Sequence, residues 1–132
     1  MTTKDEVVSP EVSAKEVAQK MRDFDIGVLP VCENGRLVGI VTDRDITIRL
    51  TAEGKDSGAT KVNEIMSAKV EWCFEDEEVE NIAVKMESKK IRRLPVINHD
   101  KKLVGMLSLG DLAVRGSRET ACEILEKVSA SV

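Results

Sequence analysis

The sequence predicts an α/β (α+β) fold made of two β-α-β-β-α units that pack together with pseudo-twofold symmetry. Three observations lead to this prediction: the chain repeats itself, each repeat contains an apolar hairpin, and helical periodicity flanks each hairpin. A unit of three strands and two helices leaves one apolar sheet face uncovered, so it cannot bury its core alone. Two units in one chain can cover each other.

The repeat appears when the chain is compared with itself. At a shift of 65 residues, residues 26–31 align with residues 91–96. Beyond that point the shift becomes 66, because the second hairpin turn holds one more residue. The predicted parts are a first unit (residues 1–50), a linker with a short helical turn (51–65), a second unit (66–115) and a C-terminal amphipathic helix (116–132).

The helix inside each unit shows both a start signal and a buried stripe. Ser13 can cap the first helix, with Glu16 three residues later as in a capping box. Apolar residues recur at helical spacing in both units. The expected buried residues are Val17, Ala18 and Met21 in the first unit, and Val79, Ile82, Ala83 and Met86 in the second.

Two apolar strands joined by a turn follow each helix. In the first unit, Asn34-Gly35 is typical of a two-residue hairpin turn, whereas the second turn, over residues 98–102, is longer and polar. Both second strands place a glycine between apolar pairs and end at a hydroxyl, Thr42 or Ser108. The glycine leaves room for another group to approach the backbone.

The segments outside the repeat are read from composition and periodicity. Residues 52–60 are rich in Gly, Lys, Asp and Ser and are expected to form a solvent-exposed loop. Thr60 is expected to cap a short turn that carries Val62 and Ile65. The final helix presents an apolar stripe near Ile124 and Leu125, which needs a partner surface.

Composition excludes several function classes. The 132 residues carry a formal net charge of -4 and almost no aromatic side chains, which argues against nucleic acid as a partner. No apolar run approaches the length of a membrane span, and the N-terminus lacks a signal-peptide pattern. We therefore expect a cytoplasmic protein that binds neither nucleic acid nor membrane.

The residues that most often perform catalysis or bind metal form no recognisable motif. Cys32, Cys73 and Cys122 are far apart, and the single histidine, His99, lies in a polar loop, so reduced and packed thiols are expected. Spacing alone does not exclude a Cys/His pair. No Ser-His-Asp order, P-loop or paired-acid motif occurs. We therefore expect no enzyme activity, no catalytic residue, no catalytic cofactor and no metal.

The repeat, the Leu-Pro-Val hairpin and the Gly-x-x-Thr/Ser-x-x-Asp signature together resemble a tandem CBS-domain protein of the stand-alone bacterial type. Residues 42–45 and 52–56 add to the resemblance. It implies a Bateman module that binds an adenosine-containing ligand, such as AMP, ADP, ATP, NAD(H) or S-adenosylmethionine, in the cleft between two CBS units. It further implies a non-enzymatic energy or redox sensor that forms a homodimer. Some members of the family bind no known ligand.

Two interpretations remain open for Thr42 with Asp45, and for Ser108 with Asp111. Their spacing resembles a capping box, in which the carboxylate satisfies a backbone N–H group. The resemblance instead implies that the aspartate accepts hydrogen bonds from both ribose hydroxyls, while the hydroxyl residue contacts ribose or phosphate. Two carboxylate oxygens suit a cis-diol.

Further ligand-binding residues follow from the resemblance. Arg92 and Arg93 precede the second Leu-Pro-Val, where the family often has a phosphate-binding side chain; the alternative is a solvated basic pair. The first unit has Gly27 and Val28 at these places, so Arg44 is the candidate that takes over part of the role of the two arginines. Val8 and Cys73 end the two first strands, where adenine contacts occur in the family, although core positions explain them as well.

Three function classes therefore remain. The first is a nucleotide-sensing module. The second is a ligand-free dimerisation or interaction scaffold that keeps the fold. The third is an enzyme, which no motif supports. The identity of the ligand, the number of occupied sites, the regulated target and the dimer orientation are not specified by the sequence.

Overall fold

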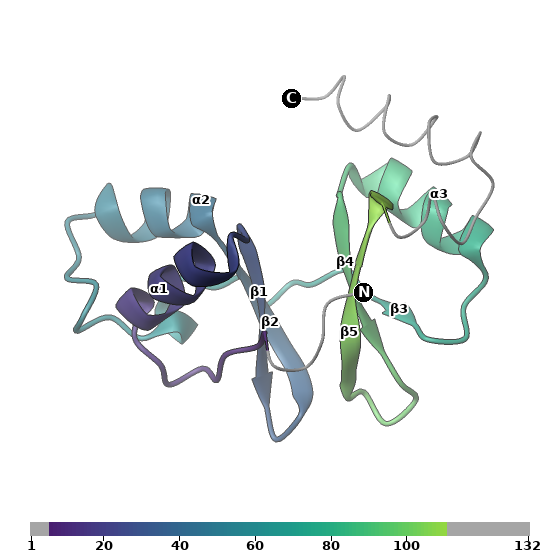
Figure 1. The fold of residues 1–132 in the computed structure, drawn as a ribbon, viewed down its shortest axis with the longest axis horizontal. Coiled ribbons are helices and arrows are strands. Elements are labelled where there is room, and N and C mark those ends of the chain that lie inside the picture. The colour runs from purple at the N-terminus through teal and green to yellow at the C-terminus, as the bar shows by residue number, and fades with distance from the viewer. Residues whose placement is uncertain (1–5, 111–132) are drawn as a thin grey trace. The chain divides into compact units, whose positions relative to one another are not determined.

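The computed structural model describes residues 6–110 (Figure 1). The chain divides into two compact units, Lys4–Val70 and a second unit that continues from Glu71. Each contains helices and a small sheet, as the sequence predicts. The pseudo-twofold packing of the units stays a prediction, and the expected C-terminal helix lies outside the described residues.

The first unit places its helices against one face of a hairpin. Its elements are α1 (Ala14–Phe24), β1 (Val28–Glu33), β2 (Arg36–Thr42), α2 (Asp43–Asp45), the π-helix η1 (Ile46–Thr51) and the 3-10 helix η2 (Val62–Glu64). The expected first strand is present only as a parallel bridge between Val8 and Val31. The core consists of apolar side chains from all of these segments except α2, including Val17, Leu29 and Leu50.

The second unit contains a three-stranded sheet. Its elements are β3 (Cys73–Phe74), α3 (Val79–Lys89), β4 (Arg93–Ile97) and β5 (Leu103–Ser108). The strand order is β3-β4-β5, with β3 parallel and β5 antiparallel to β4. Met86, Leu94 and Leu107 are buried together between α3 and the sheet, so the predicted stripe of α3 is confirmed.

The repeat extends to the details of the backbone. Helices α1 and α3 end at Asp25 and Lys90, which occupy matched positions and share the left-handed conformation, with φ of 53° and 57°. Both hairpins also change register at the matched valine, Val31 or Val96. The two sequences therefore specify the same local geometry despite many different side chains.

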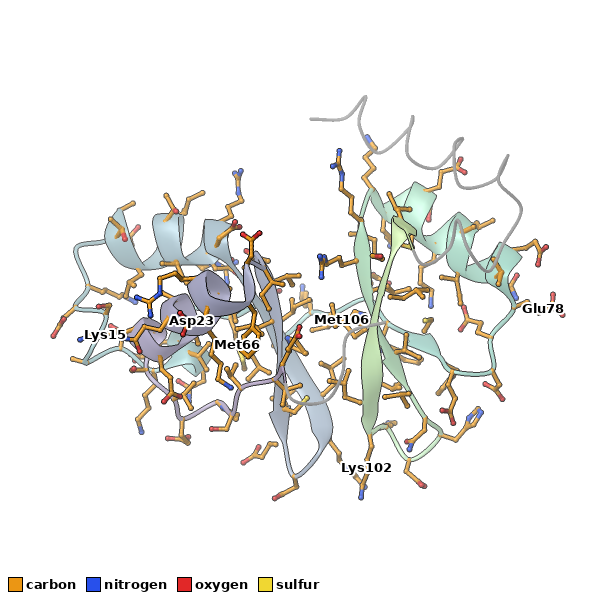
Figure 2. The ribbon with its side chains drawn as sticks, in the orientation of Figure 1. Lys15, Asp23, Met66, Glu78, Lys102 and Met106 are labelled. Atoms are coloured by element: carbon orange, nitrogen blue, oxygen red, sulfur yellow. The ribbon has the colours of Figure 1, made fainter. Side chains whose placement is uncertain are left out.

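The two hairpin turns differ as predicted. Asn34 and Gly35 both have positive φ, 53° and 79°, which is what a two-residue turn between right-twisted strands requires. In the longer second turn, the Asn98 side chain accepts hydrogen bonds from the backbone of Asp100 and Lys102. Figure 2 labels Lys102 at this turn.

The segment after the first unit's helices returns to that unit. Val62 and Ile65 are fully buried in its core. The Ser57 and Thr60 carbonyls accept hydrogen bonds from the first backbone N–H groups of α1, at Lys15 and Ala14. The loop thereby satisfies donors that a helix start leaves unpaired.

The expectation that Thr60 caps the short turn is wrong. The N-cap of η2 is Lys61, because the Thr60 hydroxyl instead donates to the Asp56 carbonyl at 2.8 Å within the preceding loop. The cap of α1 is confirmed, since the Ser13 hydroxyl accepts a hydrogen bond from the Glu16 backbone N–H.

Gly39 has the role that the sequence suggests for it. A Cβ atom at this position would lie 2.6 Å from Met66 Sδ and 2.9 Å from the Ser67 carbonyl oxygen. Its neighbour Ile40 exchanges two backbone hydrogen bonds of 2.9 Å with Ser67. The glycine therefore lets the chain after η2 pair with β2 (Met66 is labelled in Figure 2).

Candidate functional site

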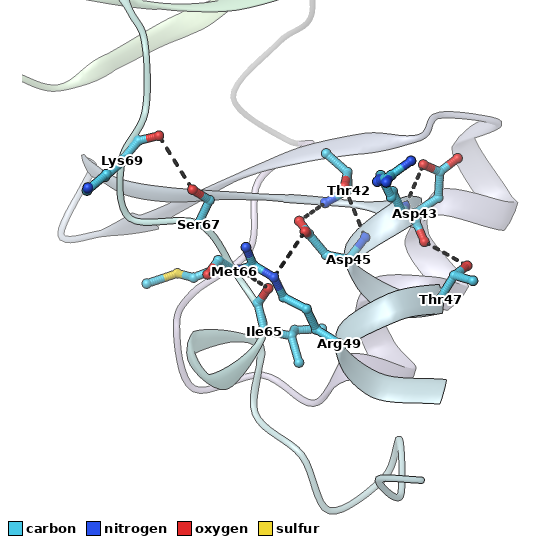
Figure 3. A network of polar contacts seen from close by, with 10 residues as sticks. Thr42, Asp43, Asp45, Thr47, Arg49, Ile65, Met66, Ser67 and Lys69 are labelled. Carbon is cyan, nitrogen blue, oxygen red and sulfur yellow. Dashed lines mark hydrogen bonds and ion pairs between the residues drawn. The ribbon is translucent and has the colours of Figure 1, made fainter. Parts of the chain in front are cut away.

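Thr42 and Asp45 form a complete capping box where β2 ends and α2 begins (Figure 3). The Asp45 backbone N–H donates to Thr42 Oγ1 at 3.2 Å, and the Thr42 backbone N–H donates to Asp45 Oδ2 at 2.8 Å. The capping interpretation is thus realised in the first unit. The cap uses one of about four hydrogen-bond acceptor positions of the Asp45 carboxylate, so it does not use up the acceptor capacity of that group.

Arg49 connects this carboxylate to the segment that follows η2. Its Nε lies 3.8 Å from Asp45 Oδ1, and its Nη1 donates hydrogen bonds to the carbonyls of Ile65 and Met66 at 3.2 and 3.1 Å. The Asp45 side chain is only 16% exposed, so this ion pair is partly shielded from water. Figure 3 shows Arg49 between Asp45 and the turn at Ile65.

Asp43 places a second carboxylate at the same helix start. Its Oδ1 accepts a hydrogen bond from the Arg44 backbone at 2.8 Å, and its own backbone N–H donates to the Gly27 carbonyl at 2.9 Å. The Arg44 side chain is exposed to solvent next to it. The first unit's candidate site therefore contains two carboxylates, Asp43 and Asp45, and two guanidiniums, Arg44 and Arg49.

The second unit brings Arg93 and Ser108 together. They are directly paired across β4 and β5, so their side chains leave the same face of the hairpin. The Arg92 carbonyl accepts a hydrogen bond from the Leu109 backbone at 3.2 Å, which places Arg92 against the same helix start. Both arginines are exposed. Asp111, the matched aspartate, lies outside the described residues.

Val8 and Cys73 belong to the cores of their units. Val8 is buried, and its backbone donates to the Pro30 carbonyl and accepts from the Cys32 N–H. Cys73 is fully buried in the parallel pairing of β3 with β4. Burial raises the pKa of the Cys73 thiol to about 11, so it is protonated and unreactive near neutral pH. Any adenine contact at these positions stays a prediction.

Aromatic side chains of the second unit cluster at β3. Phe74 stacks on His99 with ring centroids 4.6 Å apart, and Trp72 packs edge-on against Phe74. A hydrogen bond of 2.9 Å to Asp76 raises the pKa of His99 above its usual 6.5.

Within residues 6–110, no group of three His, Cys, Asp or Glu side chains could hold a metal ion.

Sequence reasoning named Gly27 as the counterpart of Arg92 but missed two residues of the first unit's site, Asp43 and Arg49. Asp43 had a signal in the repeat alignment, where it matches the uncharged Leu109. Arg49 had none, because its acceptors lie 16 and 17 residues away in the sequence.

A family model for the CBS domain matches residues 1–51 and again residues 62–116. The chain belongs to the CBS-domain family. A CBS domain-containing protein of Bacillus subtilis, YhcV, is 41% identical over 130 residues, which cover 98% of this chain and 91% of that protein. The chain is therefore a CBS-pair regulatory module, as the resemblance predicted.

Two solved CBS structures share the fold. The structure of CBSX2 in complex with AMP is 26% identical, with a TM-score of 0.74, and the match covers 87% of this chain and 90% of that one. Hypoxic Response Protein I with two coordinated zinc ions is 33% identical, with a TM-score of 0.74, and the match covers 82% of this chain and 88% of that one.

Of the helices in the part of the chain that the structure describes, none has the length and apolar character needed to cross a membrane.

Proposed function

We propose that this CBS pair is a non-enzymatic sensor that binds an adenosine-containing ligand, such as AMP, ADP, ATP, NAD(H) or S-adenosylmethionine. The observation that supports it most is the capping box of Thr42 and Asp45, whose hydroxyl and carboxylate stand at the end of β2 and recur in the sequence at Ser108 and Asp111. The AMP held by CBSX2, a protein of the same fold, supports the choice of ligand class.

The chemistry of the carboxylate fits a ribose. Asp45 Oδ2 accepts the cap hydrogen bond, and Oδ1 is 3.8 Å from the nearest Arg49 nitrogen, which is too long for a direct hydrogen bond. Acceptor positions therefore remain for the two hydroxyls of a cis-diol. In the second unit, Arg93 beside Ser108 provides donors for a phosphate group.

One observation favours a second candidate, a ligand-free interaction scaffold. The cap made by Thr42 and Asp45 is complete by itself, so stability alone can account for both residues. Asparagine separates the two functions, because its amide oxygen can still cap a helix while it offers a diol only one acceptor.

Calorimetric titration of purified protein with adenosine, AMP, ADP, ATP, NAD(H) and S-adenosylmethionine tests the proposal. Asp45→Asn and Asp111→Asn should each weaken the best ligand about 10- to 100-fold, because hydrogen bonds to a charged group contribute about 1.5–3 kcal/mol. Melting temperatures should change little. We expect the two losses to be unequal, because the units differ at Gly27 and Arg92.

Asp23→Asn is the matched control, because Asp23 is an exposed acid of α1 and the substitution removes the same charge. It should bind like the wild type. If both site variants also bind with wild-type affinity, the aspartates are caps only and the scaffold is the better description.

A further inference from the structure

The same backbone hydrogen bond joins the start of the hairpin to the start of the following helix in both units. In the first unit, the Asp43 N–H donates to the Gly27 carbonyl at 2.9 Å. In the second, the Leu109 N–H donates to the Arg92 carbonyl at 3.2 Å. The residues at these two places are therefore equivalent in space within their own units.

The side chains at these equivalent places carry opposite charge. A Cβ atom on Gly27 would lie 2.8 Å from Asp43 Oδ2, so the Asp43 carboxylate lies where a side chain of residue 27 would begin. In the second unit, Arg92 has a side chain at that place, and its helix neighbour Leu109 carries no charge. An anion in the first unit thus replaces a cation in the second.

The neighbouring charges extend this difference. Val28 is in register with Thr42 in the first hairpin, whereas Arg93 is in register with Ser108 in the second. Arg44 is the first unit's cation at the helix start, and its backbone N–H already donates to Asp43 Oδ1. Arg49 is directed to Asp45 and to the carbonyls after η2.

We infer that Asp43 is a specificity-determining residue that disfavours phosphate in the first unit. The first unit then selects an adenosyl ligand whose 5′ group is neutral or cationic, while the second selects a phosphorylated one. The inference rests on the proposed function. In the second unit, Arg92 and Arg93 would hold the phosphate of the ligand. A phosphate at the equivalent place in the first unit would lie near the Asp43 carboxylate, and the two negative charges would repel each other.

The test is calorimetric titration with adenosine and AMP at low salt, in an Asp111→Asn background that weakens the second unit's site. Asp43→Asn should strengthen AMP about 3- to 10-fold and leave adenosine within about twofold, a modest effect because Asp43 is exposed and screened. Asp43→Leu, which introduces the second unit's matched residue, should act in the same direction. The gain should shrink as salt is raised.

Asp23→Asn in the same background controls for net charge, and should leave both affinities unchanged. The inference is overturned if removal of Asp43 leaves AMP binding as it was, or changes adenosine and AMP equally. A protein that binds neither adenosine nor AMP in any variant overturns the inference. The proposed function fails as well only if ADP, ATP, NAD(H) and S-adenosylmethionine also do not bind, so the two failures are distinguishable.

Discussion

Arg93 is the residue whose position most clearly suggests a ligand group. It is exposed, and strand pairing places it beside Ser108, where the family signature predicts contact with ribose or phosphate. A guanidinium offers two parallel donors to a phosphate, which a lysine cannot. Two features, the signature hydroxyl and the cation, are thus brought together by β4 and β5 although 15 residues separate them.

Arg93→Ala should therefore weaken AMP and ATP more than adenosine. An exposed charge-assisted contact contributes less than a buried one, and we expect about 1 kcal/mol, or about fivefold in the dissociation constant. Titration of the variant with all three ligands provides the measurement. Arg36→Ala, at the exposed first hairpin turn, is the control. Equal losses for adenosine and AMP would return Arg93 to the solvated surface.

At the scale of elements, β2 pairs with its hairpin neighbour β1 and also with a segment that is distant in sequence. It pairs with β1 along its length, and Ile40 also pairs with Ser67 after η2. Arg49, on the π-helix η1, donates hydrogen bonds to two backbone carbonyls of the same segment. The candidate site at the end of β2 therefore depends on the linker being in place.

Gly39→Ala tests this dependence. The added methyl would meet the Ser67 carbonyl and Met66 Sδ below 3.0 Å, so a backbone segment must shift. We expect a loss of about 1–3 kcal/mol in the free energy of unfolding, measured by chemical denaturation. Gly58→Ala is the matched control, because its nearest atom would be 3.9 Å away. Equal stability of the two variants would show that Ser67 can move freely.

At the scale of the whole molecule, the helices carry exposed apolar side chains. Phe24 at the end of α1 is 49% exposed and Ile48 on η1 is 44% exposed. An open groove of about 420 Å³ lies between α1 and η1, lined by Ala14, Ala18, Ile46 and Leu50 among others. Of the described candidate site residues, none lines this groove. The groove is thus separate from the described candidate site residues.

We expect the protein to be a homodimer in solution, with the exposed apolar side chains Phe24 and Ile48 contributing to the interface. Light scattering at tens of micromolar protein should return twice the chain mass, and Ile48→Asp should shift it towards the monomer, because a charge in an apolar interface is costly to desolvate. Asn63→Asp, an exposed substitution with the same charge change, should remain dimeric. A monomer mass for the wild-type protein contradicts the expectation. The predicted contribution of Ile124 and Leu125 lies outside the described residues.

The amino-acid sequence by itself determined the features that depend on local physics and on the repeat. The Ser13 cap, the Asn34-Gly35 turn and most of the two helical stripes follow from interactions within a few residues, and they are observed. Ala18 was expected to be buried but is partly exposed and lines the groove between α1 and η1. Each sequence fragment of the repeat is weak evidence for a family when it occurs once. Because the fragments occur twice in the same order, together they indicated the family.

The tertiary structure decided what the distant segments do. Thr60 was expected to cap a turn, but its carbonyl and that of Ser57 pair with the start of α1, and its hydroxyl stays within the loop. Similarly, the Asp43 carboxylate is placed against Gly27, 16 residues earlier, by a hydrogen bond between strand and helix. Periodicity and caps do not encode such contacts, because they arise only when separate elements pack and their remaining donors and acceptors must be satisfied.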